Sequence, residues 1–343
     1  MSEDQPRLAC LLTPQRNTQY ADLVAQLALP ELQMSPLGAL IVHAETRAIA
    51  GLPFLVLTLS QTPSDEQLVH LGELSMTRGF FWLDHPTGEA RDMVLRPIHI
   101  APPRGLPDGL LYARRYKGKT NEDLTRFLLN VARFASNFVQ APRPLDVLDP
   151  LCGGGTSLFA ALSAGHNAYG IDHARRDVES TASFLRQFLI QAGIRHQIRE
   201  ERLRQLGRRW TFTIEGPDGP LTCVLAHGDT RAAGDLLSGL RPHLIVGDLP
   251  YGIQHKGAVL DLLTSGLPVW ARMLRPGGGL ALAWDATRLP REEMLAAALQ
   301  AAPDMEFLDT APWNDLTHAV DRVIKRRDVL TGRRRGLQAD DRR

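Results

Sequence analysis

The second half of the chain alternates short apolar runs with helix-like segments, and this alternation limits the folds available to it. The apolar runs that we predict to be strands are 145–149, 167–171, 224–227, 244–246, 279–284, 306–310 and 320–325. Segments with the length and apolar spacing of helices lie between most of them, at 156–164, 177–193, 260–274 and 291–301. Strands that alternate with helices of this length favour βαβ units. We therefore predict an α/β fold with a mostly parallel sheet, whose last two strands form an antiparallel edge pair.

The first 110 residues have a different pattern, in which strands predominate. Predicted strands cover 8–12, 39–42, 54–59 and 80–83, and predicted helices cover 20–29 and 64–74. A stretch rich in Pro and Gly, 97–109, is the predicted linker. We expect a small N-terminal α+β domain at 1–110, with an RNA-binding or an accessory role, followed by a larger domain at 111–330. A basic tail, 331–343, follows, and the chain is expected to fray after Asp328.

Two basic segments interrupt these patterns. The first carries Arg114, Arg115, Lys117 and Lys119, and it precedes an amphipathic helix at 124–138 that Thr120 or Asn121 would cap. The second, 199–209, carries five arginines and leads into a hairpin-like stretch. Basic side chains beside aromatic ones can grip a sugar-phosphate backbone. A solvated loop, or a helix end followed by an ordinary hairpin, explains the same residues, so both interpretations stay open.

A glycine-rich turn joins the first strand of the alternating region to its helix. It reads Asp149-Pro-Leu-Cys-Gly-Gly-Gly-Thr156. Its glycines let the backbone turn tightly beside a ligand, and the helix N-terminus favours an anionic group. The glycines are contiguous, unlike those of a dinucleotide site, and the Gly-Lys-Ser/Thr of a phosphate loop is missing. The predicted ligand therefore has an anionic end but need not contain a pyrophosphate.

Acidic residues follow the next strands, where a bound nucleoside needs acceptors. Asp172 lies 19 residues beyond Gly153, near the spacing of about 20 for an acid that binds a ribose hydroxyl. Asp229 could accept a hydrogen bond from an adenine amino group. S-adenosylmethionine has the ribose, the adenine and the anionic end, although each acid alone could simply cap a loop. The predicted cofactor-binding residues are Asp149, Cys152, Gly153, Gly155, Thr156, Asp172, His173, Asp229 and Thr230.

The strand at 244–246 runs directly into Asp248-Leu-Pro-Tyr-Gly252. A carboxylate, the Leu249 carbonyl and an aromatic ring together suit a flat heterocycle with an exocyclic amino group. Pro250 stiffens the turn and has no N–H that could occupy a nearby carbonyl. An ordinary turn is the alternative, because Asp, Pro and Gly are common turn formers. The predicted catalytic residues are Asp248, Leu249, Pro250 and Tyr251.

Taken in order, 149–156, Gly170-Ile-Asp172, Gly228-Asp229 and 248–252 resemble the class I S-adenosylmethionine-dependent amino-methyltransferases. This group includes DNA adenine-N6, DNA cytosine-N4 and RNA guanine-N2 enzymes. Tyr116-Lys-Gly-Lys-Thr-Asn-Glu-Asp123 and Asp321-Arg-Val-Ile-Lys-Arg326 are most similar to the tRNA guanosine-10 N2-methyltransferases of archaea and eukaryotes. The resemblance covers about residues 112 to 330, and no THUMP domain is recognisable. The family usually has Asp-Pro-Pro-Tyr, whereas this chain has Leu249 at the second position.

The resemblance implies a Rossmann-like fold, S-adenosyl-L-methionine as cofactor and methyl transfer to guanine N2 in tRNA. A DNA amino-methyltransferase is the alternative, and a catalytically silent cofactor-binding module is a third hypothesis. The net charge of +1, from 39 basic and 38 acidic residues, excludes a globally cationic nucleic-acid coat but not a local basic groove. Whether a small activating subunit is needed stays undecided.

The cysteines and the lengths of the apolar runs indicate the cellular compartment and bear on whether a metal or a membrane is involved. Cys10, Cys152 and Cys223 are far apart and odd in number, so they suggest neither a disulfide framework nor a zinc site. We therefore expect a cytoplasmic protein, and the expected chemistry requires no metal. No apolar run approaches the roughly 18 residues of a membrane span, so no membrane partner is expected.

Overall fold

The computed structural model describes residues 5–14, 21–84, 94–101, 104–116, 119–250, 256–320 and 325–336. The chain forms two compact units, Met1–Pro102 with Thr310–Arg326, and Pro103–Asp309 with Arg327–Arg343. The first boundary lies eight residues before the predicted one at 110. The second unit is interrupted, because the chain returns to the first unit at Thr310, where Ala319 N donates to Gln26 Oε1 at 3.3 Å. The prediction of two consecutive domains misses this return.

The first unit is built on a five-stranded antiparallel sheet in the order β2-β3-β1-β4-β5. The strands are β1 (Arg7–Leu12), β2 (Ile41–Ile49), β3 (Leu52–Leu59), β4 (Thr77–Asp84) and β5 (Val94–Pro97). Its helices are α1 (Ala21–Met34), η2 (Gly38–Leu40), α2 (Asp65–Leu68) and η3 (Val69–Glu73). Ser64 caps α2 by accepting from Gln67 N at 3.3 Å, and α1 continues through Pro30 beyond its predicted end. Strand β5 was not predicted, and it ends at Pro97, where the predicted linker begins.

The second unit contains a nine-stranded sheet in the order β13-β14-β12-β11-β6-β7-β10-β9-β8. The central pairs, β12-β11-β6-β7-β10, are parallel, and the strands at both edges are antiparallel. The strands are β6 (Asp146–Asp149), β7 (Asn167–Asp172), β8 (His196–Leu203), β9 (Gly207–Gly216), β10 (Gly219–His227), β11 (Leu244–Asp248), β12 (Gly279–Asp285), β13 (Met305–Phe307) and β14 (Arg327–Arg334). The predicted Rossmann-like α/β sheet with an antiparallel C-terminal edge is confirmed.

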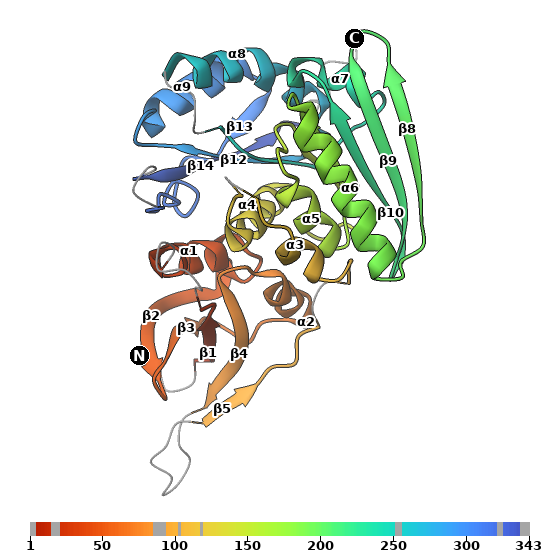
Figure 1. Cartoon of the computed structure of the whole chain (residues 1–343). Coiled ribbons are helices and arrows are strands. Elements are labelled where there is room, and N and C mark those ends of the chain that lie inside the picture. The colour runs from red at the N-terminus through yellow and green to blue at the C-terminus, as the bar shows by residue number, and fades with distance from the viewer. Residues whose placement is uncertain are drawn as a thin grey trace, which may run out of the picture. The chain divides into compact units, whose positions relative to one another are not determined.

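Helices cover both faces of this sheet. Figure 1 shows α4 and α5 on one face and α8 and α9 on the other. The helices are α3 (Gly109–Ala113), α4 (Glu122–Ala135), α5 (Thr156–Ser163), α6 (Arg175–Gln191), η4 (Thr230–Ala232), α7 (Ala233–Leu236), α8 (Lys256–Met273) and α9 (Arg291–Ala301). Asn121 caps α4 by accepting from Leu124 N at 3.0 Å, as predicted. Helix α4 is almost entirely buried because it packs against β11, β12 and β14.

The C-terminal strand lies further along the chain than predicted. The expected strand at 320–325 is wrong, since residue 320 belongs to no strand, 321–324 lie outside the described residues and β14 begins at Arg327. The expectation of a frayed tail is also wrong as far as Arg334. Strand β14 lies between β12 and β13, which buries Val329, Leu330 and Thr331. The basic composition of this segment concealed its apolar stretch.

The second basic segment is a strand. Residues 196–203 form β8, which pairs with β9, and β9 pairs with β10, so two antiparallel strands extend the sheet beyond its parallel centre. The interpretation of 199–209 as a helix end is therefore wrong, whereas the hairpin is present. Across the described residues, no helix is both long enough and apolar enough to span a membrane.

Candidate active site

A cleft of about 750 Å³ opens at the carboxyl ends of the central parallel strands. Strands β6, β7 and β11 are neighbours in the sheet and end in Asp149, Asp172 and Asp248. Parallel strands present their carboxyl ends at one edge, which is where open α/β sheets bind ligands. All three acids line the cleft, together with Cys152, Gly153, Thr156, His173 and Pro250. The topology thus brings together acids that are up to 99 residues apart in the chain.

The glycine-rich turn forms one wall of the cleft. Gly153 and Gly155 have φ angles of 45° and 83°, and Gly155 immediately precedes α5. A Cβ atom at Gly155 would lie 2.6 Å from Thr181 Cγ2. Gly153 N donates to Asp172 Oδ2 at 2.9 Å, and Ala174 N donates to Asp172 Oδ1 at 2.8 Å. A carboxylate has about four acceptor positions, so Asp172 is fixed by the backbone and still has acceptor capacity left.

Asp149 lies between the other two acids and is almost completely buried. Its Oδ1 accepts from Leu151 N at 2.9 Å, and its Oδ2 accepts from the Ser157 hydroxyl. Burial raises the pKa of Asp149 to about 7, although both hydrogen bonds oppose the rise. The charges of Asp172 and Asp248 add to the increase in pKa. The cleft therefore holds three carboxyl groups of which one is readily protonated near neutral pH.

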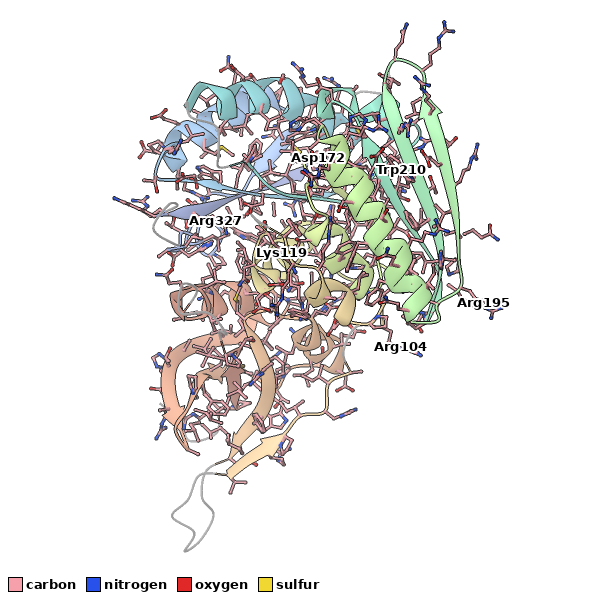
Figure 2. The ribbon with its side chains drawn as sticks, viewed as in Figure 1. Arg104, Lys119, Asp172, Arg195, Trp210 and Arg327 are labelled. Carbon is pink, nitrogen blue, oxygen red and sulfur yellow. The ribbon has the colours of Figure 1, made fainter. Side chains whose placement is uncertain are left out.

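Asp248 has two carboxylate oxygens in very different surroundings. Oδ2 accepts from Thr120 Oγ1 at 2.9 Å and lies 3.5 Å from Arg327 Nη2. Figure 2 labels Arg327 at the start of β14 and Asp172 at the end of β7. Oδ1 is buried and has no hydrogen-bond partner among the described residues. Burial raises the pKa of Asp248, whereas Arg327 and Thr120 oppose the rise.

Arg114 and Tyr116 belong to the cleft wall, although the sequence did not single them out as site residues. The Arg114 guanidinium donates to Thr181 Oγ1 at 2.6 Å and to the Gly154 carbonyl, and it lies 4.9 Å from the centre of the Tyr116 ring. The Tyr116 hydroxyl is 2.7 Å from Thr156 Oγ1. For Arg114, the interpretation as a solvated loop residue is therefore wrong.

The contiguous glycines explain why this segment can fold onto the turn. A Cβ atom at Gly154 would lie 2.1 Å from the Tyr116 ring, so only glycine leaves room for the ring. Lys119 completes the fold, because its Nζ donates to the carbonyls of Leu111 and Arg114 at 2.9 and 2.8 Å. The sequence did contain a signal for this contact. A run of three contiguous glycines is not required by a phosphate-binding motif, so it indicates that another part of the chain packs against this turn.

The remaining predicted residues are placed differently. The Leu249 side chain is buried in the core. This does not affect the prediction, which concerns only the main-chain carbonyl of Leu249. Asp229 is held by Arg231, whose Nε lies 3.0 and 2.9 Å from the two carboxylate oxygens. Thr230 is buried and its hydroxyl accepts from Trp270 Nε1 at 2.9 Å. Asp229 and Thr230 are not among the residues that line the cleft. Tyr251 lies outside the described residues.

Comparisons with known proteins give structural similarity only. No protein-family model matches the chain, and no curated protein matches it. TrmN from Thermus thermophilus is 14% identical, with 96% of this chain and 99% of that chain covered and a TM-score of 0.45. The 16S rRNA N2 G1207 methyltransferase RsmC of T. thermophilus, solved with AdoMet and guanosine, is 16% identical over 87% of this chain and 59% of that chain, with a TM-score of 0.40.

A third solved structure has a different kind of substrate in its name. Precorrin-6y C5,15-methyltransferase from Geobacter metallireducens is 12% identical, with 65% of this chain and 93% of that chain covered and a TM-score of 0.37. At these identities and scores, what can be said of the site rests on this chain's own residues and geometry.

Proposed function

We propose that this chain is an S-adenosyl-L-methionine-dependent methyltransferase that acts on an exocyclic amino group of a nucleobase in RNA, with guanine N2 in tRNA as the target. The observation that carries the proposal is Asp248 Oδ1, a buried acceptor without a partner in the cleft that also contains the glycine-rich turn and Asp172. Leaving a buried acceptor unsatisfied costs about 1–3 kcal/mol. A donor on a bound substrate would remove that cost.

The residues of the cleft fit the cofactor. The remaining lone pairs of Asp172 suit ribose hydroxyls, and the turn at Cys152 and Gly153 lets a ligand approach the backbone before α5, which begins at Thr156. Gly155 shapes this turn with its positive φ. The volume of about 750 Å³ lies in the usual range for small-molecule sites. When bound, S-adenosyl-L-methionine supplies an activated methyl group.

The adenine end of the cofactor is assigned to residues that follow β7 and β10. His173 lines the cleft beside Asp172, and we assign Asp229 and Thr230 to the adenine. Asp229 would accept from the adenine amino group through a lone pair that Arg231 does not occupy, since a carboxylate can accept more than two hydrogen bonds.

The chemistry assigned to Asp248 follows from its two oxygens. An exocyclic amine is a poor nucleophile because its lone pair is delocalised into the ring. With Thr120 and Arg327 on Oδ2, Oδ1 would accept one N–H of the amine, and the Leu249 carbonyl would accept the other. A raised pKa makes Asp248 a stronger base than an ordinary carboxylate, so it can also take the proton that the amine loses. The base must leave its stack to reach the cleft, and we assign the stacking role to Tyr251.

Isotope transfer tests the proposal directly. The purified protein is incubated with methyl-tritiated S-adenosylmethionine and with total tRNA, rRNA or genomic DNA, and the labelled nucleosides are then separated. We expect label in N2-methylguanosine from tRNA. Label in DNA alone would support a DNA amino-methyltransferase instead. Cofactor binding by calorimetry without label in any nucleic acid would support a silent module.

A further inference from the structure

The hairpin of β8 and β9 carries its turn to the same edge of the sheet as the cleft. In the strand register, Arg208 on β9 pairs with His227, the last residue of β10, and His227 pairs with Asp172 at the end of β7. The turn at 204–206 therefore lies beyond the carboxyl ends of the parallel strands, two strands outward from Asp172. Figure 1 shows the hairpin as a long extension at the side of the sheet.

A continuous group of arginines connects the cleft wall with this turn, and we call it the arginine ridge. Arg176 on α6 lines the cleft. Next to it, Arg175 pairs with Glu179 at 2.8 Å, and Arg208 lies 3.8 Å from the same carboxylate. The ridge ends at Arg202, which is opposite Arg208 in the register, and at Arg204 in the turn.

The ridge has more positive charge than its acids compensate. Its five arginines face three acids, Glu179, Glu200 and Asp177, so it carries about +2 in a chain whose net charge is +1. Arg176, Arg202 and Arg204 are exposed and have no ion pair or hydrogen bond with any described residue. Three arginines without a partner among the described residues therefore lie together on the ridge beside the cleft.

The rest of the hairpin shows the opposite arrangement. Arg195 pairs with Glu215 at 2.6 Å, Arg199 with Glu201 at 3.0 Å, and Arg209 with Glu201 at 2.9 Å. Figure 2 labels Arg195 at the end of the hairpin that lies away from Asp172. The arginines at the end of the hairpin far from the cleft are thus paired. Near the cleft, Arg208 and Arg209 are paired as well, whereas Arg202 and Arg204 have no partner among the described residues. A hairpin that served only to extend the sheet would not need this asymmetry.

We infer that the arginine ridge binds the phosphodiester backbone of the RNA on the side of the cleft away from Asp248, beyond the nucleotide that enters the cleft; this inference rests on the proposed function. The ridge lies four to five strands from Asp248, about 19 to 24 Å along the sheet, so it would contact phosphates a few nucleotides away from the base that enters the cleft. Guanidinium groups match phosphate oxygens in charge and in bidentate geometry. Contacts of this kind fix the position of the nucleic acid and carry no sequence information.

Binding measurements with two matched double variants of the full chain test the ridge. Arg202→Gln/Arg204→Gln removes two unpaired charges, and Arg195→Gln/Arg199→Gln removes two paired charges from the same hairpin. Affinity for tRNA is measured by fluorescence anisotropy between 50 and 200 mM salt. The ridge variant should bind about tenfold more weakly, with the slope of log affinity against log salt reduced by about 1 to 2. The control variant should change affinity by less than about twofold.

Three results would overturn the inference: equal losses in both variants, an unchanged salt slope in the ridge variant, or duplex DNA competing better than tRNA. Both variants change exposed side chains, so their thermal midpoints should match that of the parent protein. The outcomes also separate this inference from the proposed function. Methyl transfer to tRNA with an unaffected ridge variant would refute the ridge alone. Salt-dependent tRNA binding through the ridge without methyl transfer to any nucleic acid would refute the enzyme alone.

Discussion

Asp172 and Asp248 end neighbouring parts of the same parallel sheet and line the same cleft, yet their carboxylates are held in different ways. Both oxygens of Asp172 accept backbone N–H groups, from Gly153 and Ala174. Asp248 has side-chain partners on Oδ2 only, and its Oδ1 is buried without a partner. A carboxylate fixed by the backbone, like that of Asp172, suits the binding of the cofactor. A carboxylate with one buried oxygen that lacks a partner, like that of Asp248, suits a step in which an N–H of the substrate arrives as the donor. Each of the following predictions tests that division.

The largest expected effect is that of Asp248→Asn on methyl transfer. The variant keeps the shape of the side chain but loses its charge and its basicity. Since a general base contributes about 10²- to 10⁴-fold, transfer should fall by at least about 100-fold, while cofactor affinity by calorimetry stays within about threefold. The matched control is Asp285→Asn, which changes an acid that ends β12 and accepts from Thr287 N at 3.0 Å. A comparable loss in both variants would mean that Asp248 acts by holding the fold.

Asp149, which lies between the two, should make the protein less stable as the pH rises. Its folded-state pKa of about 7 exceeds the ordinary value of 3.8, so the folded state holds a proton that the unfolded chain has already released. Stability should therefore decrease from about pH 4 to pH 7, and the decrease between pH 5 and pH 8 should be about 3 kcal/mol. Urea unfolding of Asp149→Asn should remove most of this decrease. An equally steep decrease in the variant would show that Asp149 is ionised when folded at pH 5.

Asp172→Ala should act on binding and hardly on the chemical step. It removes an acceptor that fixes the glycine-rich turn and that we assign to the ribose, so cofactor affinity should fall by about 10- to 30-fold. At saturating cofactor, the rate constant for methyl transfer should stay within about threefold of the parent value. If that rate constant falls as far as it does in Asp248→Asn, the division between a binding acid and a catalytic acid is wrong.

The three acids that line the cleft could be predicted because topology alone decides their meeting. Alternating strands and helices imply a parallel sheet, and a parallel sheet gathers its strand ends. Asp229 shows where this reasoning stops, since its carboxylate pairs with Arg231, only two residues away, and Asp229 is not among the residues that line the cleft. The order of the strands predicts which strand ends meet, but it does not predict which side chains will pair with an acid at such an end.

The two basic segments were indistinguishable by composition, and the structure uses them differently. Arg114 turns inward because the three glycines make room for the segment that carries it, a tertiary contact that no local pattern reports. Arg202 and Arg204 stay in solvent because β8 is an edge strand. The prediction also missed strand β14, which lies in a basic segment. Its short apolar stretch is buried only because β12 and β13 pair with it on either side, and this pairing is a tertiary contact.

The smallest expected effect is that of Thr120→Val, which removes one partner of Oδ2 and leaves Oδ1 of Asp248 unchanged. The Thr120 hydroxyl donates to Asp248 Oδ2 and favours the ionised carboxylate. Without it, the pKa of Asp248 should rise further. Transfer needs the ionised form, so activity falls as the pH drops through this pKa, and the acidic limb of the pH–rate profile should move to higher pH.

The control for Thr120→Val is Thr125→Val, which removes a hydroxyl that also belongs to the cleft lining but donates to the Asn121 carbonyl at 2.9 Å. Its acidic limb should stay where it is in the parent protein. At pH values above the limb, Thr120→Val should transfer methyl groups at nearly the parent rate, because Oδ1 keeps its position through Arg327. A uniform loss at every pH would mean that Thr120 orients the carboxylate and does not set its pKa.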